Sequence, residues 1–357
     1  MKIVTIIGAR PQFIKAGVIT RAIKNCSNIK EVIIHTGQHF DTNMSDIFFE
    51  QMDIPRPHYN LKIASLSHGA MTGRMLEKIE EILLKEQPAW VLVYGDTNST
   101  LAGALAASKL HIKVAHIEAG LRSFNMEMPE EQNRVLTDKL SKILFCPTLT
   151  AQNNLLKEGY DTNYLPLVGD VMFDAAKYYS QRSKKPTKLS TEIKSGKFVL
   201  GTIHRAENTN DLLRLRSIVE ALNEIQKSEP VVVPLHPRTK TILETNKIVT
   251  KFIILEPVGY LEMVYLLQHC SLVISDSGGL QKEAYFFEKQ CLVTRDETEW
   301  VELLDHGSNQ LVGVKRSDIL VAYERSKLAK VDYTIPFYGN GHCAEEIINY
   351  IINYGLN

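Results

Sequence analysis

The sequence predicts an α/β protein built from two parallel-sheet domains, and three observations lead to this prediction. In each half of the chain, short apolar runs alternate with stretches of helical periodicity. Such alternation is typical of parallel strands joined by right-handed helical crossovers, a Rossmann-like arrangement. Between the halves, residues 178–197 are rich in Lys, Ser and Thr and poor in apolar residues. The length of 357 residues is ample for two domains.

The first half begins with an apolar run that stops at Gly8 and is followed by a helix that opens near Pro11. We expect further strands at residues 31–36, 90–94 and 114–117, and helices at residues 71–86, at residues 99–110 and after Pro129.

In the second half, the same patterns predict strands at residues 198–201, 231–235, 252–255, 272–275 and 290–294, and helices at residues 211–227, at residues 260–270 and from Leu280. The predicted domains are therefore residues 1–177 and 178–357. A C-terminal helix at about residues 344–354 could cap either domain, and packing back on the N-terminal domain is the arrangement we put forward.

Composition excludes several classes of protein. Hydrophobic residues make up 44% and charged residues 23%, the profile of a soluble globular chain, and the formal net charge is zero, so we expect no nucleic-acid partner. No apolar stretch approaches the roughly 20 residues that cross a bilayer, and the N-terminus reads as a strand rather than a signal peptide. We expect a cytoplasmic protein with no membrane partner. The cysteines lack CxxC spacing, which argues against a disulfide framework or a metal site.

Carboxylates gather at the ends of two predicted strands. Asp96 follows residues 90–94, and Glu118 ends the next apolar run, just before Ala119 and Gly120. Ligands of open α/β sheets bind in the crevice outside the carboxyl ends of the strands. Glu130 and Glu131 follow at the start of a predicted helix. In the alternative interpretation, Glu118 is solvated, Asp96 is a helix N-cap, and the paired glutamates only stabilise a helix N-terminus.

Two strand–turn–helix segments have the features of anion sites. After Gly8, the first predicted helix carries Arg10 and Lys15, and free N–H groups at a helix N-terminus bind phosphates. The segment is not GxGxxG, so the nicotinamide fingerprint is absent. After residues 272–275, Ser277, Gly278 and Gly279 open a helix in which Glu283 is suited to ribose hydroxyls. Either segment could instead be a plain turn.

Histidine and arginine pairs follow two other strands of the second domain. His204 is followed by Arg205, and His236 is followed after one residue by Arg238. Histidine suits acid–base chemistry near neutral pH, and arginine suits phosphate.

Together, the segments GARPQFIK, GDTNST, HIEAGLR, MPEEQNR, GTIHRAEN, HPR and DSGG with QKE resemble the non-hydrolysing UDP-N-acetylglucosamine 2-epimerase family, in order and from residue 2 to about residue 341. The resemblance implies a GT-B-like fold of two Rossmann-like domains with an interdomain cleft, which binds the UDP-sugar. It also implies a homodimer, no metal and no cofactor. The family inverts C2 by eliminating UDP to give a 2-acetamidoglucal, and then adding UDP back with C2 protonated from the other face.

The resemblance also implies roles for individual residues. The acid–base residues would be Asp96, Glu118, Glu130 and His204. Arg10 and Lys15 would lie near the diphosphate of the UDP-sugar, and Ser277, Gly278 and Gly279 would hold it. Glu283 would bind the ribose. Arg134, His236 and Arg238 fall in matching segments and have less defined roles in binding.

Some segments depart from the common family pattern. The stretches GARPQFIKA and FNMEMPEE are more similar to the branch that acts on UDP-2,3-diacetamido-2,3-dideoxyglucuronate, a precursor of bacterial surface polysaccharides. Arg74 and Arg122 are candidate partners for the carboxylate of such a sugar. Phe40 and Asp41 differ from the residues of members with an activating second UDP-GlcNAc site, which argues against that kind of regulation.

The substrate could be UDP-GlcNAc or its diacetamido-uronate analogue. Three other functions stay open at this point: a hydrolysing epimerase that releases UDP and a free N-acetylmannosamine-type sugar, a GT-B glycosyltransferase, and a nucleotide-sugar sensor without catalysis.

Overall fold

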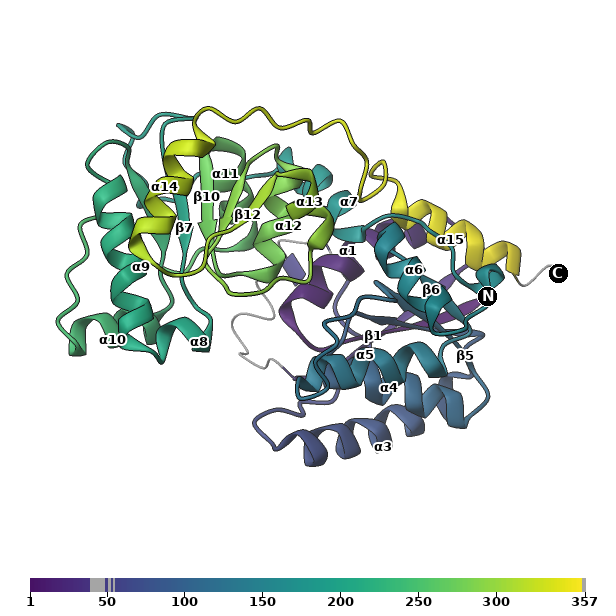
Figure 1. Ribbon diagram of the computed structural model, residues 1–357. Coiled ribbons are helices and arrows are strands. Elements are labelled where there is room, and N and C mark those ends of the chain that lie inside the picture. Colours follow the sequence, from purple (N-terminus) through teal and green to yellow (C-terminus); the bar gives the residue numbers. More distant parts are fainter. Residues whose placement is uncertain (39–48, 51–52, 54, 355–357) are drawn as a thin grey trace. The chain divides into compact units, whose positions relative to one another are not determined.

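The computed structural model describes residues 1–38, 49–50, 53 and 55–354 (Figure 1). These form two compact units. Unit 1 comprises Met1–Ala175 and Pro336–Asn357, and unit 2 comprises Ala176–Ile335. The boundary expected from the sequence, at 177/178, falls beside the first crossing, and residues 336–357, grouped there with the second domain, belong to unit 1 by their contacts.

Unit 1 contains a six-stranded sheet in which all the named strands pair in parallel. The strands are β1 (Lys2–Ile7), β2 (Lys30–His35), β3 (Tyr59–Asn60), β4 (Trp90–Tyr94), β5 (Lys113–Ile117) and β6 (Ile143–Phe145), in the order β3-β2-β1-β4-β5-β6. This is the doubly wound order, in which the direction of the crossovers reverses between β1 and β4. The carboxyl ends of β1 and β4 are therefore the expected place for a ligand.

Helices cover both faces of this sheet. They are α1 (Arg10–Lys24), α3 (His68–Glu86), α4 (Asn98–Lys109), α5 (Pro129–Leu140), α6 (Leu149–Lys157), α7 (Val171–Ser180) and α15 (Cys343–Tyr354), with a short 3-10 helix at Thr162–Tyr164. In Figure 1, α3, α4 and α5 lie on one face, and α1 and α15 lie against each other on the other. Residues of α3 with helical spacing, such as Met75 and Ile79, pack on Val4 and Ile6 of β1.

The last helix completes the core of unit 1. The Tyr354 ring lies 5.4 Å from that of Trp90 on β4, and the Tyr350 ring lies 5.7 Å from that of Phe145 on β6. The two segments that connect the units also touch each other within unit 1. Asp170 donates its amide hydrogen to the Tyr338 carbonyl at 3.0 Å, and a Cβ on Gly169, whose φ is +86°, would lie 2.6 Å from the same oxygen. Only glycine fits there.

Unit 2 repeats the same topology. Its parallel strands are β7 (Val199–Thr202), β8 (Val231–Pro234), β9 (Ile253–Leu255), β10 (Leu272–Ser275), β11 (Cys291–Val293) and β12 (Asn309–Leu311), in the order β12-β11-β10-β7-β8-β9. Its helices are α8 (Ala206–Thr209), α9 (Leu212–Ile225), α10 (Pro237–Thr245), α11 (Tyr260–His269), α12 (Gly278–Phe286), α13 (Val301–His306) and α14 (Arg316–Ser326). The crossovers reverse between β7 and β10, where a ligand is again expected.

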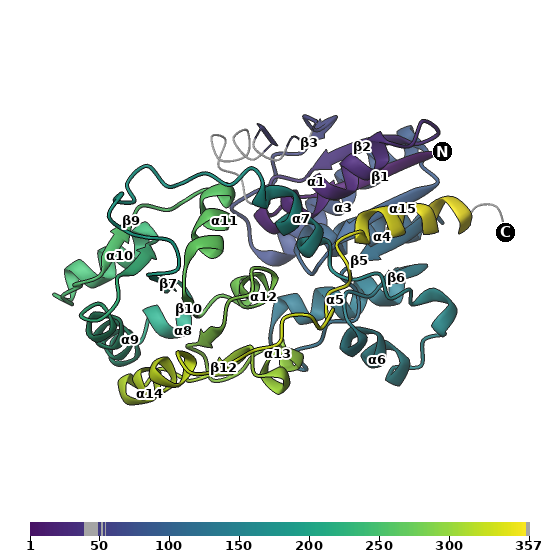
Figure 2. The same cartoon turned by 90° about the horizontal axis from the view of Figure 1, so that it is seen from above.

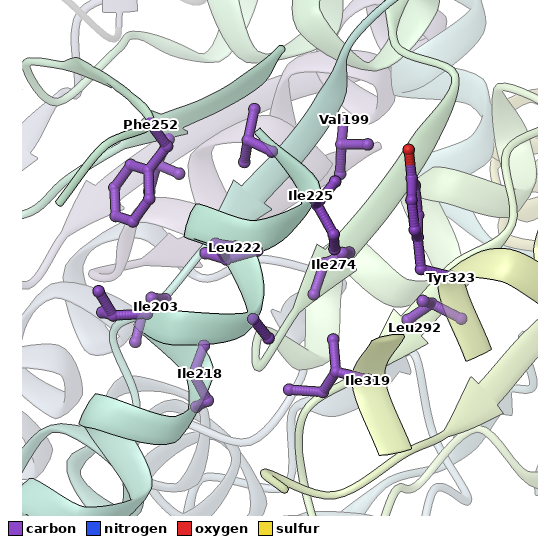
Figure 3. Packing of buried hydrophobic residues seen from close by; sticks show 14 of the residues in the cluster. Val199, Ile203, Ile218, Leu222, Ile225, Phe252, Ile274, Leu292, Ile319 and Tyr323 are labelled. Atoms are coloured by element: carbon purple, nitrogen blue, oxygen red, sulfur yellow. The ribbon is translucent and has the colours of Figure 1, made fainter. Parts of the chain in front are cut away.

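The core of unit 2 lies between the sheet and the neighbouring helices α9 and α14, which are side by side in both views (Figure 1, Figure 2). Figure 3 shows Leu222 and Ile225 of α9 beside Ile274 of the sheet, with Ile319 and Tyr323 contributed by α14. The opposite face is covered by apolar residues of α11 and α12. Because both faces are buried, the central strands are largely apolar, with the sequences VLGT in β7 and LVIS in β10.

The predicted elements and the observed ones agree closely in the centre of each sheet. Residues 90–94 and 272–275 are strands with the predicted bounds, whereas β6, β12 and α14 were not predicted. The predicted linker at residue 178 begins inside α7. Four of the five cysteines are buried, Cys26 is partly buried, and all are free thiols. Among the described residues, no helix has the length and apolar character needed to span a membrane.

His35, at the end of β2, is fully buried beside the rings of Phe13 and Phe49, at 5.2 and 6.1 Å. Neither ring nitrogen has a hydrogen-bond partner among the described residues. Burial lowers the pKa of His35 from 6.5 to about 4, because the charged form would lose its hydration. The folded protein therefore holds His35 neutral.

We predict that this histidine makes unit 1 acid-sensitive. Between pH 6.5 and about 4 the unfolded chain binds the proton and the folded chain does not. The free energy of unfolding should therefore fall as the pH falls, by about 1.4 kcal/mol per pH unit from this group. Urea unfolding at pH 7.5 and pH 5.0 should show a smaller loss in His35→Leu than in the wild type. An equal loss in both proteins would contradict the prediction.

Candidate active site

The site in unit 1 lies at the ends of β4 and β5, where two residues have left-handed backbone conformations. Gly95 follows β4 with φ of +61°, and Glu118 follows β5 with φ of +71°. A non-glycine residue in this region is strained and is held there by its surroundings, and such residues cluster at functional sites. The conformation of Glu118 is thus a first structural sign of a functional role.

Glu118 forms an ion pair with Lys15 of α1, and both side chains are over nine-tenths buried. Gly95 lies directly beside this pair, since a Cβ on it would be 3.3 Å from both Glu118 Oε2 and Lys15 Nζ. Glu118 is therefore not a solvated side chain. Its charge is buried beside that of Lys15, a residue that was expected near the diphosphate.

Asp96 forms an ion pair with Arg134 of α5, which also contacts Glu131 at 2.9 Å. Burial alone lowers the pKa of the Arg134 guanidinium, but the charge and hydrogen bond of Asp96 and the charges of Glu131 and Glu118 outweigh it, so the pKa is raised. Asn133 donates to the Asp96 carbonyl at 2.9 Å. Arg134, predicted to bind substrate, thus lies between two carboxylates of its own unit.

The two adjacent glutamates of α5 differ in burial and in their contacts. Glu131 is 1% exposed and accepts the amides of Ser123 and Phe124, at 3.0 and 2.9 Å, so it holds the preceding loop. Glu130, predicted to be catalytic, is exposed in the first helical turn, and no described contact joins it to Asp96 or Glu118.

The turn after β1 is organised by Gln12, a residue to which sequence reasoning gave no role in the site. Its side-chain oxygen accepts the amides of Gly8 and Ala9, at 2.8 and 3.0 Å, and its nitrogen donates to the Tyr94 carbonyl at 2.8 Å. Gln12 thereby ties the two strand ends at the reversal point together. Arg10 begins α1, and its side chain lies outside the described part of the structure.

In unit 2, α12 begins directly after β10. Ser277 caps it by accepting the Leu280 amide at 3.4 Å, and the amides of Gly278 and Gly279 lie in the first turn, which the helix itself does not use. A Cβ on Gly279 would meet no atom within 4 Å, whereas one on Gly278 would collide with Glu299 Oε1. The helix end is therefore open at Gly279, as an anion site requires. Glu283 lies further along α12 and is 8% exposed.

His204, at the end of β7, is held by Asp276, at the end of β10. The fully buried carboxylate accepts the amides of His204 and Arg205, both at 3.0 Å, and the Asn208 side chain at 3.2 Å, and it lies 3.0 Å from His204 Nδ1. Burial raises the pKa of Asp276, but the hydrogen bond and charge of His204 and the two amides outweigh it and lower the pKa.

The His204 side chain is 49% exposed, so Nδ1 faces Asp276 while the other edge of the ring is accessible. A carboxylate at Nδ1 favours the tautomer with its hydrogen there, which leaves Nε2 for chemistry on a ligand. Asp276 therefore orients His204. Asp276 is the first residue of the segment DSGG, but no role was predicted for it from the sequence.

His236 and Arg238 are exposed at the start of α10, after β8. His236 Nδ1 accepts the Arg238 amide at 3.2 Å, and Arg238 donates to Asn210 at 2.7 Å. Because β8 neighbours β7, both lie at the same edge of the sheet as His204.

The suggestion that Arg122 meets a sugar carboxylate is wrong, because Arg122 is buried against Asp138 and Glu158, at 2.8 and 2.7 Å. Arg74 is exposed on α3. Within the described ranges, no group of three or more His, Cys, Asp or Glu side chains could hold a metal ion.

We predict strong coupling between Lys15 and Glu118. Lys15→Met leaves Glu118 buried without this cation, and Glu118→Gln leaves Lys15 without its anion, so each should destabilise unit 1 by about 3–5 kcal/mol. The double variant should lose clearly less than the sum of the two. Chemical denaturation of all four proteins measures the coupling. The exposed pair Lys78 and Glu81 is the matched control and should show no measurable coupling. Additive losses at Lys15 and Glu118 would contradict the prediction.

Comparison with known proteins identifies the family of the chain. The family model "UDP-N-acetylglucosamine 2-epimerase" matches residues 21–352. The UDP-2,3-diacetamido-2,3-dideoxy-D-glucuronate 2-epimerase of Pseudomonas aeruginosa is 56% identical over 355 residues, 98% of this chain and 99% of the relative. The UDP-N-acetylglucosamine 2-epimerase of Methanocaldococcus jannaschii is 45% identical, over 99% of this chain and all of the relative.

Solved structures agree with this assignment. The crystal structure of the Methanocaldococcus jannaschii enzyme in complex with UDP-GlcNAc and UDP has a TM-score of 0.87 at 44% identity, covering 99% of this chain and all of that one. The Neisseria meningitidis enzyme bound to UDP-GlcNAc also has a TM-score of 0.87, at 31% identity and the same coverage. The predicted GT-B-like fold of two Rossmann-like domains is thus confirmed. The chain belongs to the UDP-N-acetylglucosamine 2-epimerase family and is a carbohydrate epimerase.

Proposed function

We propose that this protein epimerises C2 of a UDP-linked 2-acetamido sugar without hydrolysis, and that its substrate is UDP-2,3-diacetamido-2,3-dideoxyglucuronate. The observation that carries the reaction type is the pair of ion-paired carboxylates, Asp96 and Glu118, at neighbouring strand ends of unit 1. The substrate is favoured by the 56% identity to the enzyme named for that sugar. The identity is 49% to the UDP-N-acetylglucosamine 2-epimerase homolog of Methanococcus maripaludis and 45% to the UDP-N-acetylglucosamine 2-epimerase of Methanocaldococcus jannaschii.

In this proposal both units contribute residues that bind the substrate. The diphosphate binds the N-terminus of α12 at Ser277, Gly278 and Gly279, and Glu283 accepts hydrogen bonds from the ribose. Arg10 and Lys15 approach the diphosphate from unit 1, and Arg134, His236 and Arg238 complete the binding residues. The free first-turn amides and the open position at Gly279 support this placement.

The proposed chemistry is elimination followed by addition. A base removes the C2 proton, the C1–O bond breaks with its electron pair leaving on UDP, and a C1=C2 double bond forms. UDP then adds back to C1 while C2 takes a proton from the opposite face. The C2 proton is weakly acidic, so departure of the diphosphate must lead, and the α12 N-terminus with the neighbouring cations stabilises the charge that develops.

Inversion requires acid–base groups on both faces of the sugar ring. Asp96, Glu118, Glu130 and His204 are the proposed groups. The ion pairs with Arg134 and Lys15 hold Asp96 and Glu118 in fixed directions, and Asp276 presents the accessible edge of the His204 ring. Fixed geometry of this kind is what efficient proton transfer requires. Glu130 has the weakest support, because it is exposed.

The same family resemblance supports a cytoplasmic homodimer that needs no metal and no cofactor and serves the synthesis of bacterial surface polysaccharide precursors. A hydrolysing reaction is the second candidate, because the same elimination followed by attack of water would release UDP and a free sugar.

We predict that the protein in D2O incorporates deuterium at C2 of an intact UDP-sugar mixture, and does so faster with the diacetamido uronate than with UDP-GlcNAc. Proton NMR follows both substrates directly. Asp96→Asn and Glu118→Gln should each slow the exchange by about 10²- to 10⁴-fold, the usual contribution of a general acid or base. Glu127→Gln changes an exposed carboxylate of the same region and should leave the rate unchanged.

Accumulation of free sugar with an equal amount of UDP would instead establish the hydrolysing reaction. Exchange with UDP-GlcNAc alone would overturn the proposed substrate, and exchange with neither sugar would overturn the proposed reaction.

A further inference from the structure

A buried network of four charged or polar side chains lies behind the strand ends that carry Asp96 and Glu118. His116 of β5 contacts Asp138 of α5 at 2.6 Å, and Asp138 contacts Arg122 at 2.8 Å. Arg122 continues to Glu158 through two hydrogen bonds of 2.7 and 2.9 Å. The His116 and Asp138 side chains are fully buried, and that of Arg122 is 2% exposed. None of these residues has a part in the proposed chemistry.

The hydrogen-bond partners of the His116 ring indicate which of its nitrogens carry a hydrogen. Nε2 lies 2.7 Å from the Gly95 carbonyl oxygen, which can only accept, so Nε2 carries a hydrogen. On the other side, Asp138 already accepts from Arg122 and, at 3.3 Å, from the Gly120 amide. The Arg122 cation beside Asp138 favours its charged carboxylate, to which Nδ1 then donates. In this arrangement the ring is a double donor, between Asp138 and the Gly95 carbonyl.

This network joins the two turns that present the proposed catalytic carboxylates. Gly95, with φ of +61°, directly precedes Asp96 in the chain. Gly120, with φ of +79°, follows Glu118 after one residue. His116 holds the first turn through the Gly95 carbonyl, and Asp138 holds the second through the Gly120 amide. Gly120 lies close to the Ala151 carbonyl, because a Cβ on it would be 2.4 Å from that oxygen, so only glycine fits there. One carboxylate thus sets the spacing of both turns.

We propose that His116, held as a double donor between Asp138 and the Gly95 carbonyl, is a positioning residue for the epimerisation: it fixes the turn after β4 relative to Glu118, and so sets the direction of Asp96. This inference rests on the proposed function. His116 touches no substrate atom in this proposal. It acts through Gly95, where an added Cβ would lie 3.3 Å from the charged atoms of both Lys15 and Glu118.

The test compares His116→Gln with the wild type. Glutamine has one amide donor group on a longer, uncharged side chain, so it cannot donate in line to both Asp138 and Gly95. We expect kcat for C2 exchange to fall about 100-fold, the cost of a misplacement near 1 Å. KM and the Kd for UDP, measured by calorimetry, should stay within about threefold, because the proposed UDP contacts of unit 2 are unchanged.

The matched control is Glu158→Gln, which weakens the outer end of the same network but leaves the contacts of His116 with Asp138 and Gly95 in place. This variant should lower the melting temperature while kcat stays within about twofold. A purely structural role of the network would instead change kcat to the same extent in both variants.

A direct readout does not depend on activity. In a ¹⁵N spectrum of the histidine-labelled protein, one ring should show hydrogens on both nitrogens, and this signal should be missing in His116→Gln. If His116→Gln does not fold, Asp138→Asn replaces it, because an amide in that position cannot accept from His116 and Gly120 as a carboxylate does. The same loss of kcat is then expected.

An unchanged kcat in His116→Gln, or a ring with one hydrogen in the wild type, would overturn the proposal while the epimerase activity stands. A wild-type protein that exchanges neither sugar would remove the proposed function, and the positioning role with it.

Discussion

The reversal of crossover direction in each sheet is the constraint on which the rest of this structure depends. Between β1 and β4, and again between β7 and β10, the helices that follow neighbouring strands pass to opposite faces. No helix can close over the strand ends at such a point, so the chain leaves an opening lined by the first residues after each strand. Polar side chains are tolerated there, and the Asp96, His204 and Asp276 positions all follow strands at these two points.

The two units stabilise negatively charged groups by different kinds of contact. In unit 1, two carboxylates of the site are held by side-chain cations, Glu118 by Lys15 and Asp96 by Arg134. In unit 2, Asp276 accepts two backbone amides besides the side chains of His204 and Asn208, and the amides at the start of α12 remain for a ligand. Side-chain pairs fix the direction of a reacting group, whereas backbone amides provide an anion site that does not rearrange. This division matches the larger share of each unit in the proposal, with three of the four acid–base residues in unit 1 and the helix N-terminus for the diphosphate in unit 2.

Much of the fold could be predicted from the sequence, because central strands of parallel sheets are continuous apolar runs with clear ends, as at residues 90–94 and 272–275. The strand β12, with the sequence NQL, is mostly polar and gives no such signal, and the apolar run of β6, ILF, is only three residues long. Residue types at strand ends indicated Asp96, Glu118 and His204. Their partners could not be predicted, because the pairing of Lys15 with Glu118 joins segments 103 residues apart and depends on how α1 packs on the sheet.

The neighbouring glutamates of α5 show how little the residue type says about the surroundings of a side chain. Glu131 pairs with Arg134 and is 1% exposed, whereas Glu130 is exposed. Arg134 stands three positions after Glu131 and four after Glu130, so helical spacing alone would place it beside either glutamate. The roles of Gln12 and Asp276 could not be predicted for another reason. Both side chains accept hydrogen bonds from backbone amides, and the sequence does not show which amides a side chain will reach.

The return of the chain to unit 1 has a consequence for synthesis on the ribosome. Because Pro336–Asn357 belongs to unit 1, unit 2 is an insertion within it and emerges in full before unit 1 can be completed. Until α15 appears, Trp90 and Phe145 lack the aromatic rings of Tyr354 and Tyr350 that pack on them. The N-terminal half of the protein is therefore the last part to reach its final packing. Loss of a few C-terminal residues during translation would damage the sheet that was made first.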